Sequence, residues 1–218
     1  MQDSIKYILQ ILPQMLEGLK ITIKLFVVTL VLSLPLGLLI SLFKEAVSKR
    51  PTDNFVIRWI VKMPIRFIIN VYLWVFRGTP LLLQLFFFYF GLTYVTLPNG
   101  ESITLSMFTA AVISFVLNYA AYFAEIYRSG IESMPVGQYE AAKVLGYSRV
   151  QTFFRIILPQ VIKRVLPAVT NEMITLVKDT SLAFVLTVTE MFTIAKQIAA
   201  AQASVMPLMA AGVFYYIF

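Results

Sequence analysis

The residues with the clearest chemical potential lie in a long apolar stretch near the C-terminal end of the sequence. Glu172 and Asp179 are seven residues apart with Thr175 between them, so they share one face of a helix. The adjacent face carries Asn171 and Lys178. Ionisable side chains are costly at membrane depth and are therefore candidates for a functional site. A carboxylate can bind an ammonium group, and Glu172 is the first candidate, with Asp179 behind it. The alternative is an internal ion pair of Lys178 that only braces the bundle.

A second polar series follows one face of the preceding apolar stretch. Ser114, Asn118 and Tyr122 recur every four residues, which places them on one side of a helix. Polar groups at membrane depth are costly unless they face a cavity or one another. We therefore predict that these three residues contribute to a ligand site together with Glu172. The alternative is a seam of hydrogen bonds between two helices.

The composition places these side chains in a membrane protein. Hydrophobic residues make up 59% of the 218 residues and charged residues only 13%, which is more apolar surface than a soluble domain can bury. The formal net charge of +7 comes from short basic loops, which follow the positive-inside rule rather than a nucleic-acid-binding pattern. The chain has no cysteine and no histidine, which excludes disulfides, imidazole catalysis and ordinary zinc sites. We predict no catalytic residue and no metal site.

Five apolar stretches are predicted to be transmembrane helices, since each crossing needs about 20 residues. They cover about residues 20–43, 71–95, 105–127, 157–188 and 203–218. The loop after the first span is expected to be cytoplasmic because it is basic, with Lys44, Lys49, Arg50, Arg58, Lys62 and Arg66. The fourth stretch is longer than one crossing needs, and a break or strong tilt is expected at Lys178–Ser181.

Three shorter segments complete the outline. Met1–Lys20 lacks the pattern of a signal peptide and is predicted to be a short amphipathic helix at the surface. Leu97–Gly100 is predicted to form an outer turn. Val205–Phe218 would extend about 21 Å as a helix, shorter than the membrane core of about 30 Å, so we expect the natural protein to continue.

A pattern spread over twenty residues separates the third and fourth stretches. Pro135 and Gly137 break the chain, and Gln138–Leu145 is a run of good helix formers. Small alanines permit the close approach of a partner, and a glycine near the helix end permits a left-handed turn. An ordinary solvated helix is the alternative for this local pattern. The fixed positions are Glu140, Ala141, Ala142, Gly146, Ile156, Leu158 and Pro159.

With every fixed position filled, residues 135–159 resemble the EAA loop of permease subunits of bacterial ABC importers. In that family the loop is a cytoplasmic coupling helix that docks into a separate ATPase subunit, and the resemblance assigns Glu140, Ala141, Ala142 and Gly146 to this contact. Other segments resemble the polar amino-acid branch of the same family, which points to a polar amino acid as the substrate. They are Arg77-Gly78-Thr79-Pro80, Ala124–Ile131, Gly137–Glu140, Asn171-Glu172 and Lys178–Leu182.

For two of these segments, the residues themselves favour a structural role over substrate contact. Gly78 and Pro80 are expected to kink the second span, and Arg77 can extend toward water or phosphate from its end, so a role in shaping the pathway is preferred to substrate contact. Glu125 and Arg128 have the spacing of a helix salt bridge, for which a structural or coupling role is preferred.

The resemblance implies an all-α, polytopic membrane helical bundle of about five transmembrane helices with a cytoplasmic coupling helix, forming one domain over residues 1–218. The chain has no P-loop, so ATP and Mg²⁺ are expected only in a partner pair of ATPase subunits. Further implied partners are a second permease copy, identical or homologous, an external solute-binding protein, an amino-acid substrate and the lipid bilayer of the bacterial cell membrane. No cofactor is expected in this chain.

Two other classes of function compete with this interpretation. An ion-coupled secondary transporter also uses broken helices and carboxylates at the membrane midplane. The sequence has few spans for that class and no inverted pair of interrupted helices. A membrane enzyme would need a serine–base pair, and Lys178 with Ser181 is the nearest candidate. The absence of histidine and cysteine makes the enzyme the weakest of the three.

Overall fold

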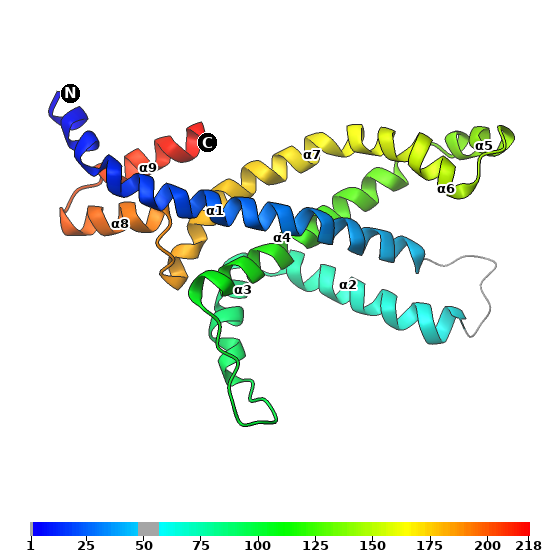
Figure 1. The fold of residues 1–218 in the computed structure, drawn as a ribbon, viewed down its shortest axis with the longest axis horizontal. Helices are drawn as coiled ribbons and strands as arrows, with labels where there is room; N and C mark the ends of the chain where they lie inside the picture. The colour runs from blue at the N-terminus through cyan, green and yellow to red at the C-terminus, as the bar shows by residue number, and fades with distance from the viewer. Residues whose placement is uncertain (1, 48–56) are drawn as a thin grey trace. The chain divides into compact units, whose positions relative to one another are not determined.

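The computed structural model describes residues 2–47 and 57–218, and this part of the chain is almost entirely helical (Figure 1). Lys49 and Arg50 of the predicted basic loop lie outside it. The all-α class predicted from the sequence is confirmed. The α-helices are α1 (Gln2–Ala46), α2 (Met63–Gly78), α3 (Leu81–Tyr89), α4 (Met107–Glu132), α5 (Val136–Val144), α6 (Arg149–Thr152), α7 (Leu158–Asp179), α8 (Met191–Ala201) and α9 (Met206–Ile217).

Short segments of tighter or wider helix join several of these elements. Two are 3₁₀ segments, η2 (Gly91–Tyr94) and η4 (Thr180–Leu186), and two are π segments, η1 (Ile57–Lys62) and η3 (Phe153–Ile157). The predicted turn at Leu97–Gly100 is present, because the Gly100 N–H donates to the Leu97 carbonyl over 2.9 Å. The predicted break after Asp179 is also present, since α7 ends there and η4 follows.

The helices form two compact units. The first unit contains Met1–Val31, Thr79–Leu117 and Ile174–Phe218, and the second contains Leu32–Gly78 and Asn118–Met173. The long helices α1, α4 and α7 each contribute residues to both units.

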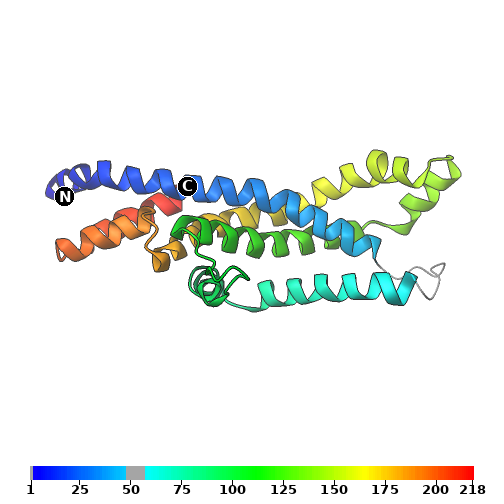
Figure 2. The same cartoon turned by 60° about the horizontal axis from the view of Figure 1, so that its bottom comes forward.

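In the first unit, the N-terminal half of α1 packs against α8 and α9, which lie beside it in Figure 1 and Figure 2. The prediction of a separate surface helix at Met1–Lys20 is wrong, because helix α1 continues unbroken to Ala46 and its apolar face at Ile11 and Met15 is buried against α8 and α9. Gly18 allows the close contact, since a Cβ there would lie only 2.7 Å from the Cα of Met191.

A buried carboxylate organises the start of α8 in the same unit. Glu190 is fully buried and accepts hydrogen bonds from the backbone N–H groups of Phe192 and Thr193, each over 2.6 Å. The hydroxyl of Tyr215 on α9 donates over 2.9 Å to the same oxygen as the Phe192 N–H. Glu190 thus caps α8 and joins it to α9, which satisfies a charge that would otherwise be costly to bury.

In the second unit, small residues bring the helices close together. A Cβ on Gly37 of α1 would lie 2.8 Å from Cβ of Phe123 on α4. Leu73 of α2 is buried against Ala121 and Ala124 of α4. Close packing over small side chains is the usual basis of helix association in membranes, where no hydrophobic force separates protein from lipid.

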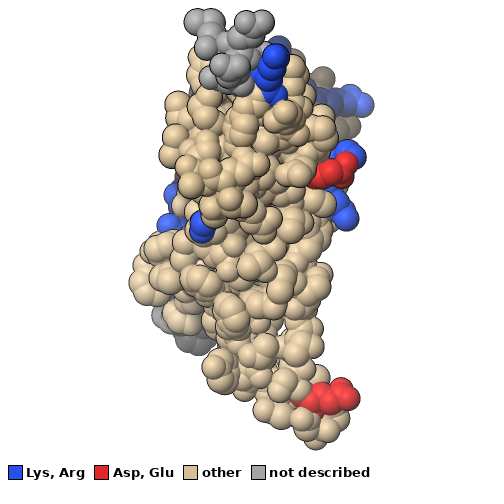
Figure 3. Space-filling model, turned by 90° about the vertical axis from the view of Figure 1, so that its left-hand side faces the viewer, with Lys and Arg blue, Asp and Glu red and all other residues tan. Residues whose placement is uncertain are grey.

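Among the described residues, α1 from Lys6 and helix α4 are long and apolar enough to cross a membrane alone. The predicted second span is interrupted, because α2 ends at Gly78 and α3 begins at Leu81. Uncharged residues cover most of the face shown in Figure 3. The arrangement in five spans stays a prediction, as does the single-domain organisation over residues 1–218.

Candidate functional site

A cavity of about 490 Å³ lies in the second unit between α4, α7 and the end of α2. Tyr122 of α4 and Glu172 of α7 both line it, and both side chains are half-buried. Two of the five residues predicted to bind a ligand are therefore brought together. Arg77, which the sequence analysis placed in a shaping role, lines the same cavity.

The packing of α4 against α7 determines the position of these side chains. A Cβ on Gly130 would lie 2.2 Å from Cγ1 of Val165, so the helices touch at this glycine. The guanidinium of Arg164 donates to the hydroxyl of Ser133 over 3.0 Å, just beyond this contact. The helices therefore run antiparallel, and Glu172 and Tyr122 lie about two turns away on the other side of the contact.

The cavity carries charges of both signs beside an aromatic ring. The guanidinium carbon of Arg77 lies 5.6 Å from the ring centroid of Tyr122, within the range of a cation–π interaction. Glu172 supplies a carboxylate to the same cavity, and Glu125 supplies a second one. Small-molecule sites typically combine an apolar wall with a few convergent polar groups, and this cavity has that composition.

Glu125 belongs to a network of ion pairs, and the predicted pair with Arg128 is confirmed. The Arg128 Nε–H donates to Glu125 over 2.9 Å, and Arg128 also pairs with Glu132. Lys44 of α1 lies 3.5 Å from the other oxygen of Glu125. These cations compensate the Glu125 charge and tie α1 to α4.

Ser114 and Asn118 lie in helix contacts. Ser114 is fully buried, and its hydroxyl donates to the Ala110 carbonyl over 2.7 Å. The amide of Asn118 donates to the Phe76 carbonyl over 2.9 Å and joins α4 to α2. This geometry favours the alternative of a hydrogen-bond seam, although the predicted role in ligand binding is not tested by it. Asp179 lies in the first unit and is not among the residues that line the cavity.

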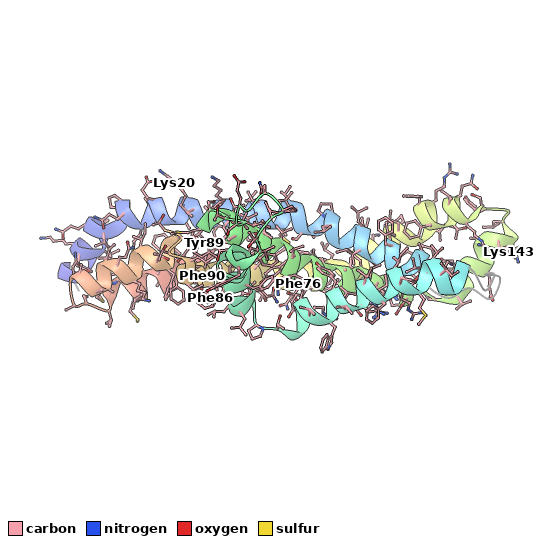
Figure 4. The ribbon with its side chains drawn as sticks, turned by 90° about the horizontal axis from the view of Figure 1, so that it is seen from below. Lys20, Phe76, Phe86, Tyr89, Phe90 and Lys143 are labelled. Atoms are coloured by element: carbon pink, nitrogen blue, oxygen red, sulfur yellow. The ribbon has the colours of Figure 1, made fainter. Side chains whose placement is uncertain are left out.

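The Arg77-Gly78-Thr79-Pro80 segment ends α2 and starts α3. Pro80 precedes the first residue of α3, where its missing N–H costs nothing. The Gln84 amide donates to the hydroxyl of Thr79 over 2.9 Å and to its carbonyl over 3.1 Å. These bonds hold Thr79 at the start of α3. Further along α3, Phe86, Tyr89 and Phe90 form aromatic pairs, with Tyr89 and Phe90 centroids 4.7 Å apart (Figure 4).

Residues 135–152 form a second candidate region, which we call the α5–α6 hairpin. The predicted helix is present as α5, and Gly146 has a φ of +76°, as a left-handed turn requires. The Ser148 hydroxyl accepts from the Gln151 N–H over 3.2 Å, and the Gln151 side chain accepts from the Ser148 N–H over 2.9 Å. This capping box starts α6 and makes the hairpin a defined structure.

The hairpin exposes an apolar surface that the sequence pattern did not identify. Val144, Leu145 and Val150 are 87%, 72% and 66% exposed. Glu140 and Ala141 are exposed beside them, whereas Ala142 is buried against its own chain. The surface open to a partner is therefore broader than the EAA positions and does not include Ala142.

Sequence reasoning also missed Glu190, the buried carboxylate that caps α8. A single carboxylate directly before an apolar helical run, with Thr193 three residues later, was the available signal. Among the described residues, no cluster of three or more Asp or Glu side chains is placed to hold a metal ion.

Comparison with known proteins identifies the class of this chain. Residues 61–218 match the family model described as "Binding-protein-dependent transport system inner membrane component". The chain belongs to this family. It is 38% identical over 207 residues to the arginine transport system permease protein ArtQ of Bacillus subtilis, covering 94% of this chain and 86% of the relative. It is 37% identical over 181 residues to the putative glutamine transport system permease protein GlnP of Rickettsia typhi, covering 82% and 74%.

Solved structures agree with this assignment. A structure described as an amino acid ABC transporter with histidines matches with a TM-score of 0.80 and 30% identity, covering 97% of this chain and 90% of the other. The MetNI methionine ABC transporter has a TM-score of 0.60 at 20% identity and shares the fold. The predicted resemblance to ABC importer permeases is thus confirmed. This permease is a non-enzymatic, multi-pass membrane subunit, and nothing in these comparisons supports an ion-coupled transporter.

Proposed function

We propose that this permease carries a polar amino acid across the bacterial cell membrane as part of an ATP-driven, binding-protein-dependent importer. The observation that carries the proposal is the cavity between α4 and α7, where Glu172 lies together with Tyr122. A carboxylate beside an aromatic ring is suited to an α-ammonium group. The named functions of the relatives, transport of arginine and glutamine, support an amino acid as the substrate.

The α5–α6 hairpin is the proposed contact with the ATPase subunits. Exposed Val144, Leu145 and Val150 provide apolar surface of the kind that marks protein interfaces. Lys143, Arg149 and Arg155 lie in or beside the hairpin, which supports a cytoplasmic location. ATP binding in the partner subunits would draw two such hairpins together and open the outward side, and hydrolysis would return the pathway to its inward state.

A second permease copy and an external solute-binding protein complete the proposed importer. One chain contributes few spans, and a closed pathway needs more helices around it. The second copy is therefore either identical or a homologous partner. ATP and Mg²⁺ bind only to the ATPase pair.

The test is to purify the permease with the ATPase and binding protein encoded beside it and to reconstitute the complex in lipid. ATP turnover is then measured with L-arginine and L-glutamine as the probes. We expect at least one of these amino acids to stimulate turnover in the presence of the binding protein. Uptake that follows a sodium or proton gradient without ATP would contradict the proposal.

A further inference from the structure

The cavity between α4 and α7 has two ends with different charge environments. At one end lie Arg77, Tyr122 and Glu172, which bring a cation, a ring and a carboxylate to the same space. At the other end lies Arg164, whose guanidinium donates to both the hydroxyl and the carbonyl of Ser133. The distance along α4 from Tyr122 to Ser133 corresponds to about 16 Å of helix.

We infer that Arg77 binds the α-carboxylate of the substrate in the cavity where Glu172 receives its α-ammonium group. The inference rests on the proposed function and adds to it the way in which the substrate is oriented. The sequence favoured a shaping role for Arg77, and the cavity geometry assigns it to the ligand instead.

The chemistry of the two charged groups supports this orientation. A guanidinium presents a planar fork of N–H donors that matches a carboxylate, and charge-assisted hydrogen bonds of this kind are the strong ones. Tyr122 holds the guanidinium by its ring at 5.6 Å. Glu125 also faces this part of the cavity, where Arg128 and Lys44 pair with it and Arg77 adds a further nearby positive charge. Arg77 and Glu172 therefore bring to one cavity the two charges that match the two ends of a zwitterion.

Arg164 does not suit the same role, although it lines the same cavity. One terminal nitrogen of its guanidinium donates to Ser133, and it lies beyond the contact of Gly130 with Val165, away from Glu172. The space on that side, lined by Ser129, remains for the substrate side chain. Recognition of both main-chain charges at one end leaves the side chain in a separate compartment, which suits a transporter of polar amino acids.

The experiment compares an amino acid with its methyl ester, which lacks the carboxylate charge. The permease–ATPase complex in lipid nanodiscs, without binding protein, is titrated with labelled L-arginine or L-glutamine. Each unlabelled amino acid and its methyl ester then compete with the label. In the parent complex we expect the ester to bind about 10- to 100-fold more weakly than the acid, as for loss of one charge-assisted hydrogen-bonded pair.

Three variants locate the source of that preference. Arg77→Gln should weaken binding of the acid and leave binding of the ester nearly unchanged, so that the preference falls toward one. Arg77→Lys keeps the positive charge and should retain part of the preference for the acid over the ester. Arg164→Gln is the matched control and should preserve the preference, because it removes an arginine from the other end of the cavity.

Each contrary result has a distinct meaning. Equal weakening of acid and ester by Arg77→Gln, or loss of the preference only in Arg164→Gln, would overturn the role of Arg77 and leave the proposed function standing. A parent complex that binds neither amino acid would overturn the cavity as the substrate site and this inference with it.

Discussion

The α4–α7 cavity and the α5–α6 hairpin belong to the same unit of the permease but are chemically opposite. The cavity gathers charged groups around Tyr122, where Glu125 and Glu172 are half-buried and Arg77 is exposed. The hairpin exposes the apolar side chains of Val144 and Leu145, by 87% and 72%. A small zwitterion is recognised by charge in a confined space, whereas a protein partner is recognised by apolar surface and shape.

The difference teaches that one pair of helices can serve two recognition tasks by separating them along its length. Helices α4 and α7 hold the cavity, and the chain between them forms the hairpin. In the proposed mechanism, a change in the separation of two such hairpins would reach the cavity through the contact of α4 with α7. The predictions below alter one region, the other, or the contact that joins them.

The largest effect is expected from Gly130→Val, which alters the contact on which both regions depend. Its Cβ would lie 2.2 Å from Cγ1 of Val165, so the Val165 side chain or the two helices must shift, at a cost of about 1–3 kcal/mol. We expect a lower unfolding temperature and loss of both substrate binding and ATPase association. Thermal unfolding of the purified protein measures the first. Gly212→Val is the control, because nothing lies within 4 Å of a Cβ there, and equal unfolding temperatures would contradict the prediction.

Glu172→Gln should weaken amino-acid binding in the cavity and leave the ATPase contact of the hairpin unchanged. Loss of the charged acceptor is expected to weaken amino-acid binding by about 10- to 100-fold, as for a charge-assisted hydrogen bond. Equilibrium binding to the permease–ATPase complex measures this effect, while the amount of ATPase recovered stays constant. Glu101→Gln changes an exposed carboxylate in the turn region and should bind as the parent does. Unchanged affinity of Glu172→Gln would remove Glu172 from the site.

Leu145→Asp should weaken the ATPase contact of the hairpin and leave the cavity unchanged. The side chain is 72% exposed, so the permease itself should fold normally, but a charge would enter the proposed interface. We expect about tenfold less ATPase in pull-downs with tagged permease. Lys143→Gln, on the same hairpin, should change recovery much less. Full recovery with Leu145→Asp would show that this surface does not face the ATPase.

Ser114→Ala is expected to have the smallest effect and sharpens the limits of the cavity. Its hydroxyl donates within α4, so its loss should cost about 0.5–1.5 kcal/mol of stability at most. Amino-acid affinity should remain at the parent value. A tenfold loss of affinity with normal stability would return Ser114 to the ligand site.

Much of the fold could be predicted from periodicity and from local chain breakers. The break after Asp179 follows from polar residues inside an apolar stretch, and the interruption at Gly78–Pro80 follows from glycine and proline chemistry. The pair of Glu125 with Arg128 follows from helical spacing alone. These features depend on residues close together in the sequence, so local rules apply to them.

Other features depend on contacts between distant segments, which spacing cannot reveal. The apolar face around Met15 looked like a surface helix because the sequence does not show that α8 and α9 cover it. Ser114 and Asn118 resembled a ligand face because a seam and a cavity require the same periodicity. Arg77 joined Glu172 only through the packing of α2 and α7 around α4.

The most direct test of the account is ATP-dependent uptake of a radiolabelled amino acid into proteoliposomes that contain the permease, its ATPase and the binding protein. The account predicts uptake that requires ATP on the ATPase side, falls strongly with Glu172→Gln and persists with Glu101→Gln. Uptake driven by an ion gradient without ATP, or equal uptake by Glu172→Gln and the parent, would contradict it.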